Sequence, residues 1–353
     1  MLIRPRRIAI AVAVVLGTTA TQVAWSATHE LKASLTTVHR SMLDASLPPV
    51  LTIDSGDRVK LETASGNPRY FESLGVPKEK IPRELYPVFA GVEGTGRGDH
   101  TLNGPIAVRG AQKGDTLEIR ILSVDLRLPI AGQGFRPGGG VLPDEFPYRK
   151  DRPLFIDLKA KTIEYAPGVN VAAKPFWGVM AVAPPVEAGR LSSSPPYRHG
   201  GNLDNKDLVA GTTLYLPVQV PGALLSIGDG HAAQGDGEVS GSAIETALKG
   251  EIQVILHKGG GLTAPRAETP THYMTIGLDP DLDEAAKMAT SQMVAFLAER
   301  FGLERETAYL LCSAAMDLRI TQAVDGTKGV HALIAKSIFS GSGRSPDSAR
   351  SSP

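Results

Sequence analysis

The sequence predicts a mixed α/β protein with a β-rich body and C-terminal helices packed on it. Most of its 38 glycines and 26 prolines lie between about residues 35 and 275, where they separate short apolar runs. Such punctuation is typical of strands joined by tight turns. After about residue 279 the apolar residues recur at helical spacing instead.

Five segments are predicted to be strands. Val59–Glu62 and Leu117–Ile121 alternate apolar and polar residues directly after a Gly-Asp turn, and such alternation buries one face of a strand. The other three are Thr213–Val220, Ala223–Ile227 and Glu251–Leu256. We expect residues 213–227 to form a two-stranded hairpin.

Two helices are predicted near the C-terminus. Asp279 or Asp281 can cap the first, and Gly302 is a suitable stop for it. The second is expected near Arg305–Met316. Apolar residues on one face of each helix, Cys312 among them, are expected to fill a core. Residues 341–353 are rich in Ser, Gly and Pro and have little to bury, so they are predicted to be a disordered tail.

Composition excludes several classes of protein. A hydrophobic fraction of 42% with 21% charged residues is that of a globular chain and excludes global disorder. Lys+Arg and Asp+Glu balance at 37 each, so the chain lacks the excess of basic residues that would predict a nucleic-acid partner. Cys312 is the single cysteine, which excludes an internal disulfide.

The N-terminus has the order of a secretory signal. Three arginines within Met1–Arg7 precede the apolar run Ile8–Leu16, and small residues follow up to Ala27. The run is shorter than the roughly 20 residues of a membrane span. We therefore expect residues 1–27 to be a signal peptide, and the mature protein to be periplasmic or secreted without stable membrane association. An uncleaved anchor, a buried strand and the choice between Sec and twin-arginine export remain open.

Chemistry-bearing residues concentrate in two segments, His199–Asp204 and Gly228–Glu238. Together they supply two His, three Asp, one Glu, one Asn and one Gln among glycines that permit tight turns. Imidazole with carboxylate suits zinc and similar divalent ions, which can activate water. Ordinary turn chemistry and a structural calcium loop remain open alternatives.

Other nucleophiles have less support. The sequence has no Gly-x-Ser-x-Gly elbow. Cys312 lies within a predicted helix without a neighbouring His, which is a poor setting for a thiolate. Metal-activated water is therefore preferred over a serine or cysteine nucleophile.

These two segments closely resemble the central motifs of the acetamidase/formamidase family. The resemblance extends to Gly104–Ala111, to Pro175–Gly178, to Asp317–Gln322 and to Asp325-Gly326, and covers about residues 36–340. It implies a catalytic domain spanning residues 28–340. It also implies hydrolysis of a small primary amide to a carboxylate and ammonia, a divalent metal, zinc first, and a homo-oligomer. Calcium stays possible from the residue types of the two segments alone.

We hypothesise a set of metal ligands and a set of catalytic residues. The expected ligands are the polar side chains Asn202, Asp204, Asp229, His231 and Glu238. Glu238 is the first candidate for the proton-transferring carboxylate. Glu245 is the second candidate for this carboxylate; alternatively, it is a residue on the surface of a helix. His199 is expected to be a ligand or to orient one.

Four further histidines are assigned lesser roles. His100 is a candidate pocket residue, whereas His257, His272 and His331 are expected to be structural or on the surface. Three functions stay open at this point: the amidase, a metal-dependent hydrolase of the same fold acting on another substrate, and a non-catalytic β-rich protein with structural calcium.

Overall fold

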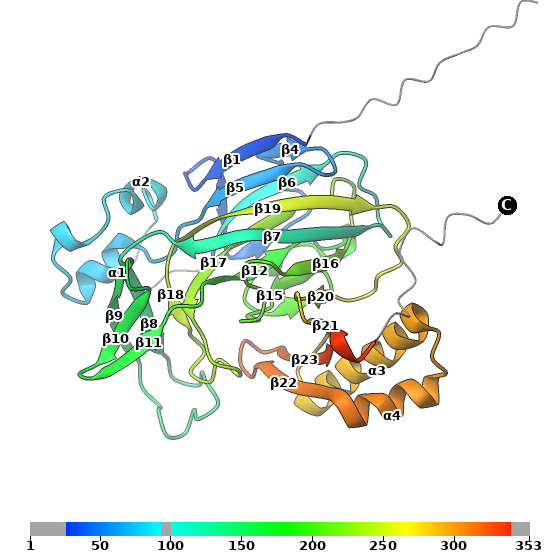
Figure 1. The fold of residues 1–353 in the computed structure, drawn as a ribbon. Helices are drawn as coiled ribbons and strands as arrows, with labels where there is room; N and C mark the ends of the chain where they lie inside the picture. The colour runs from blue at the N-terminus through cyan, green and yellow to red at the C-terminus, as the bar shows by residue number, and fades with distance from the viewer. Residues whose placement is uncertain (1–25, 93–99, 340–353) are drawn as a thin grey trace, which may run out of the picture.

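The computed structural model describes residues 26–92 and 100–339, and these residues form two large β-sheets (Figure 1). The predicted signal peptide lies outside the described residues except for Ser26 and Ala27, and the predicted tail lies outside them altogether. Within the described ranges, no helix has the length and apolar character needed to cross a membrane.

The first sheet has nine strands, and it begins with a parallel pair at one edge. Its strands, in spatial order, are β1 (Thr28–Lys32), β5 (Arg58–Glu62), β19 (Leu248–His257), β7 (Thr116–Leu126), β16 (Thr213–Pro217), β20 (Arg266–Glu268), β21 (His272–Asp279), β23 (Lys328–Ala335) and β22 (Met316–Gln322).

The second sheet has twelve strands, nine of them in one path. That path is β11 (Val169–Ala172), β10 (Thr162–Ala166), β9 (Lys150–Asp157), β8 (Ile130–Phe135), β18 (Ile244–Glu245), β17 (Leu225–Ala233), β12 (Phe176–Ala181), β15 (Gly200–Asn202) and β14 (Pro196–Tyr197). Strand β6 (Thr101–Val108) pairs with β17 and also with β2 (Val38–Arg40) and β4 (Leu51–Ile53). A separate pair joins β3 (Met42–Leu43) to β13 (Leu191–Ser192).

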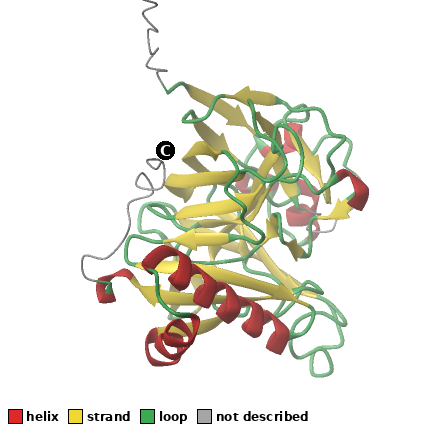
Figure 2. Cartoon of the chain, turned by 90° about the vertical axis from the view of Figure 1, so that its right-hand side faces the viewer, coloured by secondary structure: helices red, strands yellow, loops and turns green. Residues whose placement is uncertain are grey.

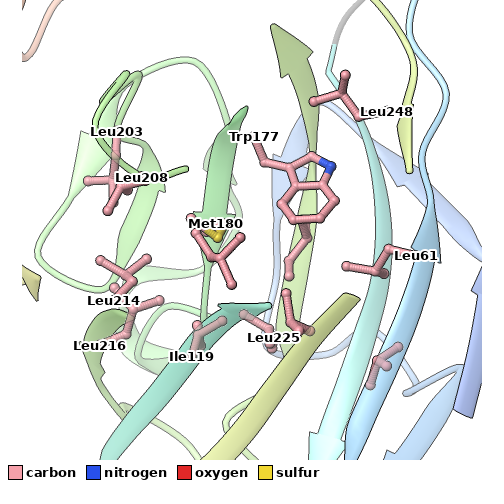
Figure 3. Packing of buried hydrophobic residues seen from close by; sticks show 14 of the residues in the cluster. Leu61, Ile119, Trp177, Met180, Leu203, Leu208, Leu214, Leu216, Leu225 and Leu248 are labelled. Carbon is pink, nitrogen blue, oxygen red and sulfur yellow. The ribbon is translucent and has the colours of Figure 1, made fainter. Parts of the chain in front are cut away.

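The main core lies between the two sheets. Leu61 and Ile119 of the nine-stranded sheet pack in one buried cluster with Trp177, Met180 and Leu225 of the twelve-stranded sheet (Figure 3). In β5, Val59 and Leu61 are buried whereas Arg58 and Lys60 are exposed, as the alternation predicts. Strand β12 is buried at every position because it lies in the middle of its sheet.

The predicted C-terminal helices are confirmed. Asp281 caps α3 (Leu282–Phe301) by accepting hydrogen bonds from the amides of Asp283 and Glu284, and Gly302 ends it at a φ of 69°. Helix α4 is Arg305–Ala315. Both helices lie along the β21–β23–β22 end of the nine-stranded sheet (Figure 2).

The second helix differs in detail from the expectation. Its Ala308 and Cys312 are buried, but Ala315 is exposed because the chain enters strand β22 at Met316. A smaller core forms elsewhere, where α1 (Pro68–Ser73) and α2 (Leu85–Val88) bury Tyr70 and Leu85 beside Ile130 of β8. Three short 3-10 helices, Lys78–Lys80, Val186–Ala188 and Lys336–Ile338, complete the described elements.

The predicted hairpin of residues 213–227 is wrong. Strand β16 pairs with β7 and β20 in the nine-stranded sheet, whereas β17 pairs with β12, β6 and β18 in the twelve-stranded sheet. Ala223 and Leu224, both with φ near +60°, turn the chain from one sheet to the other. Each strand buries its apolar residues from opposite sides of the same core, which a hairpin in one sheet could not do.

Candidate active site

Strand β17 carries the centre of the site. Side chains two residues apart in a strand share a face, and Asp229 and His231 accordingly point the same way. His231 Nε2 lies 3.1 Å from Asp229 Oδ2. Both side chains are buried. Residues 228 to 233 belong to this central strand, so the alternatives of ordinary turn chemistry and a calcium loop do not apply to them.

Glu245 reaches this centre from the adjacent strand. It is the cross-strand partner of His231 in the β17–β18 ladder, and its Oε2 lies 3.1 Å from His231 Nε2. Its Oε1 accepts a hydrogen bond from the amide of Ala243. The alternative interpretation of Glu245 as a surface helix residue is wrong, because the side chain is buried in a strand.

Asp204 and Glu238 enter from two loops. Asp204 follows β15, and its Oδ1 lies 3.7 Å from His231 Nε2. Ligand atoms of Asp204, His231 and Glu238 all lie within 4.8 Å of one another, as do those of Asp229, His231 and Glu245. The two groups share His231, so one imidazole faces four carboxylates.

Gln234 fixes the orientation of that imidazole, a role the sequence argument did not assign to it. Its Nε2 donates to the carbonyl of Asp204 at 2.7 Å, which places its Oε1 opposite His231 Nδ1 at 2.8 Å. An amide oxygen only accepts, so Nδ1 carries the proton and donates. When the ring is neutral, as binding of a metal requires, its Nε2 has a lone pair directed at the carboxylates. Histidines that bind metals are commonly held by a second hydrogen bond of this kind.

Gly178 of β12 leaves room for the cluster. A Cβ atom there would lie 2.5 Å from both Asp204 Oδ1 and Asp229 Oδ2, and 2.9 Å from His231 Cε1. Real Cβ atoms do not approach other atoms so closely. The absence of a side chain at Gly178 therefore lets two carboxylates and an imidazole converge beside the strand.

Asn202, Asp325 and His100 lie at the edge of the centre. Asn202 Nδ2 donates to Asp325 Oδ2 at 3.1 Å. His100 Nε2 lies 3.9 Å from Asp229 Oδ2, and its Nδ1 is 3.1 Å from the Ser193 hydroxyl. Asn202 and His100 thus lie beside the cluster, and their expected roles as ligand and pocket residue stay predictions. Asp325 was missed as a site residue, although the Asp325-Gly326 pair formed part of the family resemblance.

His199 makes no hydrogen bond to a cluster residue within the described part of the chain. Its ring is buried and stacks on Tyr197, with the ring centroids 5.2 Å apart. Burial lowers the pKa of His199 to about 4, so the ring is neutral. The structure therefore leaves its expected role as ligand or orienter a prediction.

The other histidines take structural or surface positions. His331 is fully buried, with Nδ1 2.7 Å from the Thr321 hydroxyl and Nε2 3.2 Å from Asp207. His257 is half exposed beside Glu118, and His272 lies next to Thr271.

Strained backbone concentrates in the site. Eight non-glycine residues among those described have positive φ. Half of them are acidic residues of the site: Asp204 (46°), Asp229 (55°), Glu238 (42°) and Asp325 (62°). Left-handed backbone costs energy in non-glycine residues and persists where surrounding structure enforces it, commonly at functional sites. The fold therefore holds these carboxylates in place at the expense of local stability.

Burial and mutual repulsion raise the pKa of several carboxyls. Desolvation raises the pKa of Glu238 to about 8, with His231 opposing and Glu245 adding to the rise. The pKa of Asp204 is raised well above its ordinary value, first by burial and then by Glu238. Burial also raises the pKa of Asp325 to about 6. Burial would lower the pKa of His231, but Glu245 and Asp229 outweigh it and raise that pKa well above its usual value.

These residues suit a divalent cation. The Asp204 carboxyl is 1% exposed, and neither of its oxygens accepts a hydrogen bond from a described residue. A buried carboxylate without donors is costly unless a cation compensates it. The donors are one imidazole nitrogen and several carboxylate oxygens, which is a ligand set of zinc and related ions. The fold and the site therefore define a β-rich protein with a buried histidine–carboxylate centre that could hold a metal.

Comparison with known proteins agrees with the sequence resemblance. The profile of the Acetamidase/Formamidase family matches residues 95–194 and 185–340. The chain belongs to this family.

Several relatives are similar over much of the chain. A formamidase of Methylophilus methylotrophus is 29% identical over 64% of this chain and 73% of its own length. An acetamidase of Mycolicibacterium smegmatis is 29% identical over 46% of this chain, which matches 54% of that protein. The crystal structure of an acetamidase from Bacillus halodurans superimposes with a TM-score of 0.75 at 32% identity, covering 89% of this chain and 100% of that chain.

Proposed function

We propose that the protein is an exported amidohydrolase that converts a small primary amide to a carboxylate and ammonia with the help of a divalent cation, zinc first. The observation that carries the proposal is the convergence of Asp204, Asp229, Glu238 and Glu245 on the single buried imidazole of His231. Family membership and the activities for which its relatives are named supply the reaction class.

Asp204, Asp229 and His231 would hold the cation, with Glu238 and Asn202 beside them. A bound cation would polarise the amide carbonyl and lower the pKa of a water molecule. The donor set favours zinc over calcium, since calcium takes six to eight oxygen ligands and imidazole nitrogen is not among its usual ones. The structural-calcium alternative is correspondingly weakened.

Glu238 and Glu245 are the residues that move protons. Hydrolysis requires a carboxylate to accept a proton from water as oxygen attacks the carbonyl carbon. The same proton must then reach the nitrogen as the carbon–nitrogen bond breaks and ammonia leaves. Glu238 remains the first candidate, because its pKa of about 8 lies close to neutral pH and allows it to both accept and donate. Glu245 faces the same imidazole and is the second candidate.

Ammonia release is the direct test. Purified protein should release ammonia from formamide or acetamide, lose that activity on treatment with a strong chelator, and regain it when zinc is restored. Activity that survives complete removal of metal would contradict the metal-dependent mechanism. Restored metal binding without turnover of any amide would contradict the amidase and favour another hydrolase or a structural site.

Export and assembly are parts of the same proposal. The arginine-apolar-small order of residues 1–27 supports export, and cell fractionation of the full chain should find a shortened protein outside the cytoplasm. The family resemblance supports a homo-oligomer, which light scattering of the purified protein measures. A full-length protein in the cytoplasm would contradict export, and a monomer in solution would contradict the homo-oligomer.

A further inference from the structure

A cleft of about 580 Å³ opens beside the catalytic centre. Asp325 lies in its wall, and so does Ser240, two residues after Glu238. The connection between β8 and β9, at the lower left in Figure 1, supplies several of the lining residues, among them Arg136 and Gly140. A hydrogen bond from the amide of Val141 to the carbonyl of Val239 holds this connection against the loop that carries Glu238. The cleft therefore adjoins the site at Asp325, which is hydrogen-bonded to Asn202, and at the loop that follows Glu238.

The cleft is much larger than formamide or acetamide requires. Those amides have three and four heavy atoms, whereas pockets of about 300–1,000 Å³ are typical of drug-sized ligands. An acyl part longer than a methyl group thus has room next to the reacting carbonyl.

The charged side chains of the cleft wall leave one net positive charge, since Arg136, Arg149 and Lys328 stand against Asp151 and Asp325. Arg149 donates to Asp151, so these two residues largely cancel. Arg136 and Lys328 also line the cleft, and neither makes an ion pair with a residue in the described part of the chain. Asp325 is the remaining acidic residue of the wall. It accepts a hydrogen bond from Asn202, and burial raises its pKa while the charge of Arg136 acts on it to a smaller extent in the opposite direction.

Arg136 and Lys328 approach the cleft from different elements. Arg136 follows β8, whereas Lys328 begins β23 directly after the turn that carries Asp325. A site with cations on two sides raises the local concentration of an anionic group and orients it. A guanidinium offers paired donors that match a carboxylate.

We propose that this cleft is an anion subsite, and that the preferred substrates are primary amides whose acyl chain ends in a carboxylate. The amide group lies at the His231 centre and the distal carboxylate lies between Arg136 and Lys328. This inference rests on the proposed amidase function for the reaction, but the binding it describes can be measured without turnover.

The test compares substrates that differ in charge and little in shape. Succinamate and succinamide have the same carbon skeleton, with a carboxylate in one and a neutral amide in the other. The wild-type protein should show a kcat/KM for succinamate about fivefold or more above that for succinamide, since each exposed ion pair contributes a few-fold. Raising the ionic strength should reduce the ratio. Longer ω-carboxy amides locate the optimum chain length.

Variants separate the subsite from the catalytic centre. Arg136→Gln with Lys328→Gln should bring the ratio to about one while changing turnover of acetamide little. Arg136→Glu should reverse the preference in favour of an amide that ends in an ammonium group. Arg83→Gln is the matched control, because it removes the same charge from an exposed position outside the cleft and should leave the ratio unchanged.

The outcomes distinguish the two proposals. A wild-type ratio of one or less, or a preference that persists in the double variant, would overturn the anion subsite and leave the amidase intact. If the protein hydrolyses no amide, calorimetry measures the binding of succinamate instead. Binding to the wild type that is lost in the double variant would support the anion subsite without the amidase. No binding of succinamate to the wild type would overturn the anion subsite too.

Discussion

His231 and Glu245 are direct partners across the β17–β18 ladder, and their side chains meet with Nε2 3.1 Å from Oε2. The other ring nitrogen of His231 donates to Gln234, whose own amide group donates to the Asp204 carbonyl. The imidazole is therefore held on one side by Gln234 and faced on the other by carboxylates. Its position depends on two strands and one loop, so changes at Glu245 should be felt at the reacting centre.

Replacing Glu245 by Gln should slow turnover strongly. The change keeps the size of the side chain but removes the charge that faces His231 and one candidate for proton transfer. Loss of a positioned acid or base commonly costs 10²–10⁴-fold, and we expect a decrease in kcat/KM of about 10²-fold or more. Ammonia release measures it. Glu251→Gln, a carboxylate of β19 paired with Arg58, is the control and should keep wild-type rates. Full activity of Glu245→Gln would remove this residue from the mechanism.

Gly178→Ala should abolish metal binding. The added Cβ would approach Asp204 Oδ1 and Asp229 Oδ2 to 2.5 Å, so both carboxylates would have to move. Metal content of the purified variant, measured by mass spectrometry, is expected to fall at least tenfold. Gly235→Ala is the matched control, because a Cβ there would meet nothing within 4 Å, and it should retain the metal. An alanine variant at 178 that binds a full equivalent of metal would show that the cluster is not the binding site.

Local patterns made part of this structure predictable from sequence. The ends of α3 follow from the Asp281 cap and from Gly302, which act on neighbouring residues only. Alternation likewise located β5. The shared direction of Asp229 and His231 follows from their spacing of two residues in one strand, whereas the approach of Asp204 was expected from a hairpin that does not form.

Pairing between distant strands was not predictable in the same way. The sequence between β16 and β17 reads as a hairpin, yet each strand finds better burial in a different sheet. Glu245 lies in a segment too short to show a period, and only its pairing with β17 fixes it as a strand residue. Asp325 lies in the turn between β22 and β23, far along the chain from Asn202, and no local sequence signal marks the contact between them.

The metal-free protein should become less stable as the pH rises. The folded-state pKa of Glu238 is about 8, above its ordinary value of 4.5, so between these values the folded protein binds more protons than the unfolded chain. Stability then falls with increasing pH in this window. Urea unfolding with chelator present should give a free energy of unfolding at least about 1 kcal/mol lower near pH 8 than near pH 5.

Glu238→Gln tests that assignment, because the amide does not titrate. Its stability should depend less on pH than that of the wild type, and it should exceed the wild type near pH 8 when metal is absent. Glu251→Gln, which alters an acidic residue outside the site, should keep the wild-type dependence. An unchanged slope in Glu238→Gln would mean that other groups are responsible for it.

Gln322 should matter to activity although it touches none of the cluster side chains. It is fully buried, donates to the carbonyl of Thr327 at 2.6 Å and accepts from the amide of Val324 at 2.8 Å, so it spans the turn that carries Asp325. It also bridges to Gly237, the residue before Glu238. Gln322→Ala leaves one buried and one part-buried backbone group without these partners, at a cost of about 1–3 kcal/mol in stability. Because the turn positions Asp325 and Glu238 together, kcat/KM should also fall, by about tenfold, at temperatures where the variant is fully folded.

Gln253→Ala is the control for Gln322→Ala. It loses a 2.9 Å hydrogen bond to the Gly56 carbonyl in the turn between β4 and β5, so it should lower the melting temperature without lowering kcat/KM. If both variants lose stability and neither loses activity, Gln322 supports the fold alone and the turn does not set the catalytic geometry.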